Sequence, residues 1–254
     1  MSDALRKVAA RALALLDLTS LNDGDDEAAI AALCSRAVTP HGPVAAVCVW
    51  PRFVAQSVAA LTGTGVRVAA VANFPDGAAD VEKAVADSAA ILAAGGDEVD
   101  VVFPYRTLMS GDEAAGAELV QACKLVCGPA ARLKVIIESG ELKDPALIRR
   151  ASEIALAAGA DFIKTSTGKV PVNATLETAE IMLTVLKQHG SGGFKAAGGI
   201  RDTATAGAYL AVADRIMGPD WARPETFRFG ASGVLSDLLA VLDGKGGAAA
   251  AEGY

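Results

Sequence analysis

Lysine chemistry is suggested by one ten-residue stretch, residues 160–169 (ADFIKTSTGK). An apolar run leads into Lys164, and a turn of hydroxyl residues and glycine separates it from Lys169. A lysine in an apolar strand is unfavourable unless it is paired with an acid or neutral, and a neutral buried amine is a nucleophile for carbonyl compounds. The N–H groups, hydroxyls and cation of the turn suit a phosphate. The stretch therefore points to covalent amine chemistry on a phosphorylated carbonyl compound.

Three further charged residues interrupt apolar runs in the same way: Asp17 within LDL, Asp100 within VDV and Lys195 within FKA. Side chains on a strand alternate between its two faces, and in a barrel one face of every strand points inward. We therefore expect these residues and Lys164 to share one barrel interior. Two acids and two amines sum to zero charge, so they can pair with one another. A capping role for Asp17 and a purely structural role for Asp100 remain alternatives.

The cysteines and histidines do not suggest a metal site. No Cys-x-x-Cys pair or zinc-type Cys/His cluster is present, and with only His41 and His189 a histidine-built metal centre is not expected. Cys48 lies between two valines with no histidine near it in sequence, so we interpret it as a core residue rather than a nucleophile. We expect no metal and no cofactor.

Composition excludes several classes of function. The chain of 254 residues is 52% hydrophobic and 5% aromatic, which suits a large core of strands and helices. A net charge of −7 argues against nucleic-acid binding, because neutralising phosphates requires a basic surface. No apolar run is long enough to cross a membrane, and the first residues do not resemble a signal peptide. We expect a cytoplasmic protein with small-molecule partners, and homo-oligomerisation stays open.

Apolar runs of strand length alternate with helical patterns along almost the whole chain. Strands are expected at residues 15–19, 44–50, 66–73, 98–103, 133–138, 161–165, 193–197 and 226–230. Helices are expected at residues 3–14, 26–38, 51–62, 79–94, 112–127, 145–158, 174–188 and 203–212, with a last helix starting near residue 232. This alternation predicts right-handed βαβ units and a parallel sheet.

Eight such units predict a single (β/α)8 barrel over residues 1–254, with an additional N-terminal helix. An open doubly wound sheet is the alternative, but the first strand is not followed by the G-x-G-x-x-G turn common in that fold. Residues 244–254 are rich in glycine and alanine, and we expect a flexible tail that ends in Tyr254.

Glycine-rich turns follow three consecutive late strands, at residues 167–169, 197–201 and 230–233. Phosphate sites in (β/α)8 barrels commonly use late loops and a helix N-terminus. The sequence STGK within 166–169 is not a nucleotide-binding P-loop, since Ile163 stands where that motif has its first glycine and Val170 follows the lysine. The turns therefore predict a phosphate site without a nucleotide loop.

The chain resembles class I deoxyribose-phosphate aldolases along nearly its whole length. The matching stretches are 15–19 (LLDLT), 48–54 (CVWPRFV), 72–75 (ANFP), 97–105 (DEVDVVFPY), 134–142 (KVIIESGEL), 160–169 (ADFIKTSTGK), 194–199 (FKAAGG) and 228–232 (RFGAS). The resemblance implies reversible cleavage of 2-deoxy-D-ribose 5-phosphate to acetaldehyde and D-glyceraldehyde 3-phosphate, in deoxyribonucleoside catabolism.

The resemblance also implies residue roles. It makes Lys164 the Schiff-base lysine, Lys195 its neighbouring cation and Asp100 the proton-relay partner, and it places Asp17 where a substrate hydroxyl is oriented. Tyr254 matches a C-terminal tyrosine that some members use as a proton shuttle; a terminus without that role is the alternative. The positions that match phosphate-binding ones are Gly168, Lys169, Gly199, Ser232 and Gly233. Gly233 replaces a serine of many members, which leaves its backbone N–H to bind.

Two rival functions remain. A (β/α)8 phosphosugar isomerase or another lyase would share the phosphate turns but would need no imine. A sugar-phosphate binding protein would bind the same ligands without cleaving them. Trapping an imine separates both rivals from an aldolase.

Overall fold

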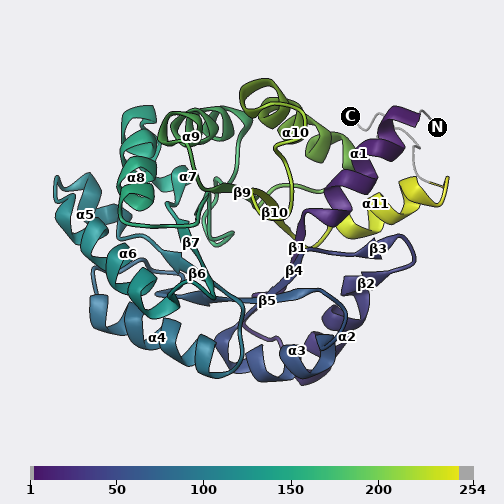
Figure 1. Ribbon diagram of the computed structural model, residues 1–254, viewed down its shortest axis with the longest axis horizontal. Coiled ribbons are helices and arrows are strands. Elements are labelled where there is room, and N and C mark those ends of the chain that lie inside the picture. The colour runs from purple at the N-terminus through teal and green to yellow at the C-terminus, as the bar shows by residue number, and fades with distance from the viewer. Residues whose placement is uncertain (1–2, 246–254) are drawn as a thin grey trace.

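Eight parallel strands form a closed barrel in the computed structural model, which describes residues 3–245 (Figure 1). The strands follow one another around the barrel in chain order, and the first pairs with both the second and the last. They are β1 (Leu16–Thr19), β4 (Ala46–Val49), β5 (Arg67–Ala72), β6 (Glu98–Val102), β7 (Arg132–Ile136), β8 (Phe162–Lys164), β9 (Gly193–Ala197) and β10 (Phe227–Ala231). The predicted (β/α)8 fold is confirmed, and closure excludes the open doubly wound sheet.

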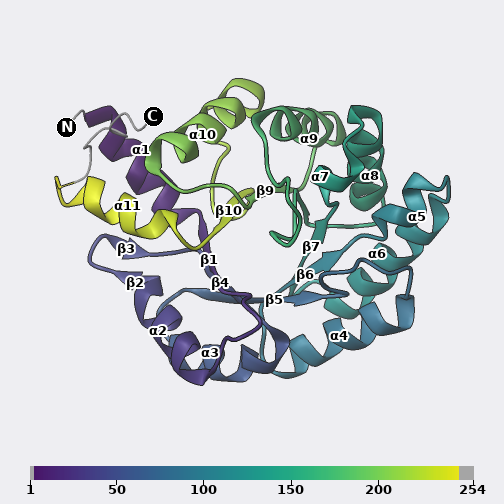
Figure 2. The ribbon, with the colours of Figure 1, turned by 180° about the vertical axis from the view of Figure 1, so that it is seen from behind.

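Helices surround the barrel as an outer ring, which is seen from both ends in Figures 1 and 2. They are α1 (Asp3–Ala14), α2 (Glu27–Ala37), α3 (Val54–Leu61), α4 (Val81–Ala93), α6 (Ala114–Cys127), α8 (Pro145–Ala157), α9 (Leu176–His189), α10 (Thr203–Met217) and α11 (Val234–Leu242). The N-terminal helix α1 is confirmed, and it packs against α10 and α11. Helix α10 continues five residues beyond its predicted end. None of the helices described is long and apolar enough to cross a membrane.

Four short elements were not predicted. A hairpin of β2 (Val38–Thr39) and β3 (Gly42–Pro43) follows α2, and α5 (Tyr105–Met109) and α7 (Ser139–Leu142) follow β6 and β7. The predicted helix at 51–62 begins with the single turn η1 (Pro51–Phe53). Apart from Gly244 and Lys245, the predicted tail lies outside the described residues.

Aspartates fix where four of the outer helices begin. Each one precedes the first helical residue and accepts a hydrogen bond from a backbone N–H of the first turn, which would otherwise lack a partner. The donors lie 2.7–2.9 Å from the carboxylates of Asp26, Asp80, Asp144 and Asp202. These caps determine where the helices start relative to the preceding strands. The strands determine which side chains point into the barrel.

The apolar core lies mainly between the strands and the helix ring. Inside the barrel the composition is different. Strands β4 and β5 contribute Cys48, Ala69 and Val71 to a small apolar cluster, which Leu21 of the loop after β1 completes. The other strands contribute charged side chains. The interior is thus divided into an apolar wall and an ionic wall.

Candidate active site

The four charged residues singled out by strand alternation all lie in the barrel interior. Asp17, Asp100 and Lys195 have no solvent exposure, and Lys164 is 2% exposed. They come from β1, β6, β9 and β8, so only the closed barrel brings them together. Their predicted placement is confirmed.

Asp100 is the centre of this group. Its Oδ2 accepts hydrogen bonds from Lys164 Nζ and from Lys195 Nζ, both at 2.8 Å. Lys195 Nζ also lies 2.5 Å from Asp17 Oδ2. One carboxylate oxygen therefore links the two lysines, which is the arrangement needed to pass a proton between them.

Three further charged residues join the same network, and the sequence analysis missed them. Lys134 of β7 donates to Asp100 Oδ1 at 2.8 Å and lies 2.5 Å from Glu98 Oε2. Arg228 of β10 lies 2.5 Å from Asp17 and 2.9 Å from Glu98. Lys134 and Arg228 each stand between apolar residues (LKV and FRF), and Glu98 shares a strand face with Asp100, two positions later (EVD). Applying the alternation rule to every strand would have identified them.

Mutual pairing keeps Asp100 and Lys195 ionised despite their burial. Burial alone raises the pKa of Asp100, but Lys134, Lys164 and Lys195 outweigh it and hold that pKa well below its ordinary value. Burial alone lowers the pKa of Lys195, yet the carboxylates of Asp100 and Asp17 raise it above the ordinary lysine value. Lys195 is therefore a fixed cation beside Lys164.

Cys48 faces the same interior from β4. Its Sγ lies 3.8 Å from Asp100 Oδ2, and burial, followed by the negative charge of Asp100, raises the pKa of the thiol. A protonated thiol is a poor nucleophile, in keeping with our interpretation of Cys48 as a core residue.

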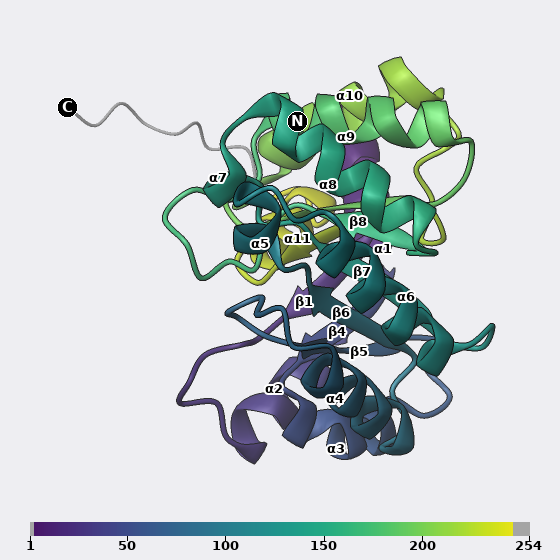
Figure 3. The same cartoon turned by 90° about the vertical axis from the view of Figure 1, so that its left-hand side faces the viewer.

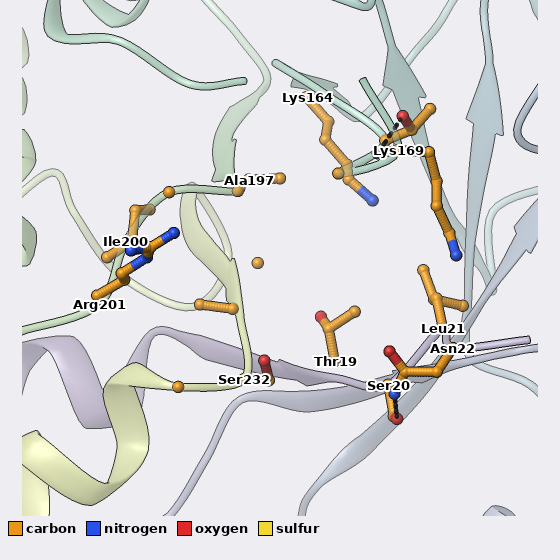
Figure 4. A pocket seen from close by; sticks show the side chains of 17 residues that line it. Thr19, Ser20, Leu21, Asn22, Lys164, Lys169, Ala197, Ile200, Arg201 and Ser232 are labelled. Atoms are coloured by element: carbon orange, nitrogen blue, oxygen red, sulfur yellow. Dashed lines mark hydrogen bonds between the residues drawn. The ribbon is translucent and has the colours of Figure 1, made fainter. Parts of the chain in front are cut away.

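A cavity of about 540 Å³ opens above the network at the end of the barrel where the strands finish (Figure 4). Of the seven network residues, Lys164 lines this cavity. In Figure 4 its side chain extends into the open space, opposite Thr19 and Ser232. The amine is thus the part of the network that a ligand reaches.

The predicted phosphate turns line the same cavity. The loops after β8, β9 and β10 contribute Gly168, Lys169, Gly199, Ser232 and Gly233, and all five predicted positions are among the lining residues. Gly198 and Gly199 have φ of 82° and 81°, a backbone that favours glycine, and such successive glycines form an anion-binding concavity. Helix α11 begins directly after Gly233, so a helix N-terminus faces the same space.

Two cations, Lys169 and Arg201, line the half of the cavity formed by the glycine turns. Lys169 Nζ lies 3.5 Å from Asp23 and 5.7 Å from the centre of the Trp50 ring. The exposed Arg201 also lines the cavity and was not among the predicted site residues, although its loop was. The protein is acidic overall, but this half of the cavity is suited to an anion.

A buried carboxylate holds the β8 turn in shape. Glu138, directly after β7, has a φ of 53° and accepts hydrogen bonds from Thr167 N at 3.1 Å and Thr167 Oγ1 at 2.5 Å. Thr167 Oγ1 in turn accepts from Lys169 N at 3.0 Å. Burial raises the pKa of Glu138, although both Thr167 hydrogen bonds oppose the shift. The sequence analysis assigned no role to Glu138.

Replacing Thr167 with valine is expected to destabilise the protein by about 1–3 kcal/mol, because the buried Glu138 carboxylate loses its hydroxyl donor and keeps only the backbone N–H of residue 167. The free energy of unfolding in urea measures this. Thr184→Val is the matched control: that hydroxyl bonds only to the Glu180 carbonyl of its own helix, and we expect a change below about 0.5 kcal/mol. Equal effects of the two substitutions would contradict the role given to Thr167.

Tyr254, the remaining predicted site residue, lies outside the described residues. Its proposed role in proton transfer stays a prediction.

Comparison with known proteins agrees with this arrangement of fold and site. The model of the DeoC/LacD family of aldolases matches residues 11–220. An apo structure from Toxoplasma gondii, assigned as a deoxyribose-phosphate aldolase, superposes with a TM-score of 0.89 at 26% identity, covering 96% of this chain and 98% of that one. A protein of the same assignment from Coccidioides immitis gives 0.81 at 28% identity, covering 92% and 86%.

The tetrameric deoxyribose phosphate aldolase from Aeropyrum pernix superposes with a TM-score of 0.75 at 26% identity, covering 93% of this chain and 92% of that one. The fold and site define a (β/α)8 barrel in which a buried lysine reaches a cavity lined by glycine-rich turns. The family match covers most of the chain, so the chain belongs to the DeoC/LacD family of aldolases.

Proposed function

We propose that this protein is a class I deoxyribose-phosphate aldolase, which cleaves 2-deoxy-D-ribose 5-phosphate reversibly to acetaldehyde and D-glyceraldehyde 3-phosphate. One observation carries the proposal: Lys164, bonded to Asp100 beneath it, enters the cavity that the phosphate turns also line. A ligand with a carbonyl at one end and a phosphate at the other fits such a cavity, whose volume lies within the usual range for small-molecule sites.

The phosphate would bind at the turns after β8, β9 and β10, with Lys169 as a counter-charge. Backbone N–H groups of Gly168, Gly199 and Gly233 and the hydroxyl of Ser232 are the available donors. Binding there directs the other end of an open-chain sugar phosphate toward Lys164. Fixing the reacting carbonyl beside the amine makes the attack intramolecular.

The reaction begins when the neutral amine of Lys164 adds to the C1 aldehyde of the open-chain substrate. Loss of water gives an imine between the Lys164 nitrogen and C1. The proton of the C3 hydroxyl is then removed, the C2–C3 bond breaks, and glyceraldehyde 3-phosphate leaves as an aldehyde. The bonding electrons pass to the iminium nitrogen as an enamine. Protonation of the enamine at C2 and hydrolysis of the imine release acetaldehyde and restore the amine.

Asp100 and Lys195 are proposed to move protons in these steps, because they lie in hydrogen-bond contact with each other and Asp100 contacts Lys164. Lys195 also places a positive charge beside the amine, since both lysines bond to Asp100 Oδ2. Asp17, paired with Lys195, is proposed to orient a substrate hydroxyl through this network, and Tyr254 to assist proton transfer at the methyl carbon.

We propose further that the chain acts in the breakdown of deoxyribonucleosides in the cytoplasm and forms a homo-oligomer, as the tetrameric aldolase from Aeropyrum pernix does. A phosphosugar isomerase and a non-catalytic binding protein are the rival functions, and neither releases acetaldehyde.

Incubation of the protein with 2-deoxy-D-ribose 5-phosphate is expected to release acetaldehyde, which a coupled alcohol dehydrogenase detects through oxidation of NADH. Unphosphorylated deoxyribose should react far more slowly, because it lacks the group that the turns hold. Binding of the sugar phosphate without acetaldehyde release would support the binding protein, and conversion to an isomeric phosphosugar would support the isomerase.

A further inference from the structure

A second layer of charged residues lies beneath the reacting group. Glu98, Lys134 and Arg228 are at most 1% exposed and do not line the cavity. They therefore do not touch a ligand bound there. They are joined to one another and to the upper layer by contacts of 2.5–2.9 Å.

The four bases of the network differ in how many carboxylates hold them. Lys195 contacts Asp17 and Asp100, Lys134 contacts Glu98 and Asp100 at 2.8 Å or less, and Arg228 contacts Asp17 and Glu98. Lys164 contacts one carboxylate, that of Asp100, at 2.8 Å. Of the four bases, Lys164 thus has the fewest carboxylate partners.

The charges in the network do not balance when every group is ionised. Among contacts of 2.9 Å or less, three carboxylates, those of Asp17, Glu98 and Asp100, face four cations, so one positive charge is in excess. Arg132 and Arg67 lie farther from Glu98, at 3.8 and 3.9 Å, and their side chains are partly exposed to solvent, which screens their charges. An unbalanced charge is unfavourable in a buried network. Loss of a proton from Lys164 removes the imbalance.

Two other titratable groups, Cys48 and Glu138, interact electrostatically with Lys164. Neither changes the order of the four bases by number of carboxylate partners. Cys48 of β4 remains a neutral thiol. Glu138 directs its two carboxylate oxygens to Thr167. Neither forms an ion pair with a base of the network among the described residues.

We propose that Lys134, Glu98 and Arg228 are positioning residues that leave Lys164 as the base that releases its proton. Lys134 and Arg228 pair with Asp100 and Asp17 beneath the cavity, and Glu98 pairs with both Lys134 and Arg228. The inference rests on the proposed function, because it concerns the amine that forms the imine. Lys134 holds Asp100 Oδ1, and this leaves Oδ2 directed at Lys164 and Lys195.

Two substitutions that remove opposite charges test this. Lys134→Met removes a positive charge and makes the network neutral with Lys164 protonated. Glu98→Gln removes a negative charge and increases the excess. Reductive trapping of acetaldehyde on Lys164 with cyanoborohydride, followed by peptide mass analysis across pH, gives the midpoint at which the amine becomes reactive. We expect an alkaline shift of about one pH unit or more for Lys134→Met and an acid shift of similar size for Glu98→Gln.

Three further variants complete the design. The double variant Lys134→Met/Glu98→Gln restores the charge balance of the wild type, and its midpoint should return toward the wild-type value. Lys134→Arg keeps the charge and should leave the midpoint within about 0.3 units. Lys124→Met is the matched control, because Lys124 pairs with Asp161 outside the barrel, and it should not move the midpoint.

The outcomes separate the two proposals. Labelling of Lys164 with the same midpoint in Glu98→Gln and Lys134→Met as in the wild type would overturn the inference and leave the proposed function intact. Absence of any label on Lys164 in the wild type at every pH would overturn the proposed function itself. If circular dichroism shows that Lys134→Met does not fold, the comparison of Glu98→Gln with Lys134→Arg tests the inference instead. Of these two variants, Glu98→Gln alone should shift the labelling midpoint.

Discussion

Replacing Lys164 with methionine is expected to reduce cleavage of 2-deoxy-D-ribose 5-phosphate by a factor on the order of 10⁴ or more. The methionine side chain is similar in length but cannot form an imine, so the covalent route is lost as a whole rather than weakened. The initial rate of acetaldehyde release at saturating substrate measures the effect.

Two controls distinguish this loss from unfolding and from weak binding. Lys164→Met leaves Asp100 paired with Lys134 and Lys195, so the variant should fold and unfold cooperatively as the wild type does. Lys169→Met removes a cation from the half of the cavity that the glycine turns line. This variant should have a higher KM, while imine formation continues. A Lys164→Met protein that keeps a tenth of the wild-type rate would exclude Lys164 as the nucleophile.

Asp100→Asn is expected to have the second-largest effect, on both activity and stability. Lys134, Lys164 and Lys195 all donate to this carboxylate, and a neutral amide leaves their charges uncompensated. Breaking a buried ion pair from one side costs about 3–5 kcal/mol, and loss of the proposed proton-transfer group should lower kcat by about 10²–10⁴-fold. Urea unfolding and steady-state kinetics measure the two effects.

The stability effect of Asp100→Asn should depend on pH in a defined direction. The folded pKa of Asp100 lies below its unfolded value, so its ionised form contributes its full stability above the ordinary aspartate pKa. That contribution is lost as the pH falls below about 4 toward the folded pKa. The difference in unfolding free energy between the wild type and Asp100→Asn should therefore be constant near pH 7 and shrink in acid.

Asp214→Asn is the matched control for this substitution. Asp214 pairs with Arg11 at 2.7 Å on the outer surface, where the carboxylate is 27% exposed. Exposed pairs contribute at most about 1 kcal/mol, so this variant should be almost as stable as the wild type and fully active. An equal loss of stability in both variants would contradict the special position given to Asp100.

Much of the fold was accessible from local sequence pattern. All eight barrel strands and the long helices between them were predicted, with ends that agree to within five residues, because apolar periodicity is a local property of each segment. The inward direction of Asp17, Asp100, Lys164 and Lys195 followed from strand alternation alone.

Features that depend on contacts between distant segments were not predicted. Helix α7 is one short turn after the strained Glu138, and Glu138 is held by Thr167, 29 positions later. Nothing within residues 139–142 signals a helix by itself. The pairing of Glu98 with Arg228 likewise spans 130 positions and exists only because the barrel closes. Tertiary contacts decide such details, and local patterns do not carry them.

The side view in Figure 3 shows why the late loops combine into one site. The loops that follow the strands collect at one end of the barrel, with α5 and α7 beside them. The turns after β8, β9 and β10 are neighbours there because their strands are neighbours in the sheet. Adjacent strand ends therefore bring three separate glycine turns into one wall of the cavity next to Lys164, where we propose that the phosphate binds.

The most direct test of the account is to treat the protein with borohydride in the presence of acetaldehyde and to map the modified peptide by mass spectrometry. The account predicts the added mass of one ethyl group on Lys164 and loss of activity in proportion to labelling. Omission of acetaldehyde should leave the peptide unmodified. Labelling confined to Lys169 or Lys195, or inactivation without any labelled lysine, would contradict it.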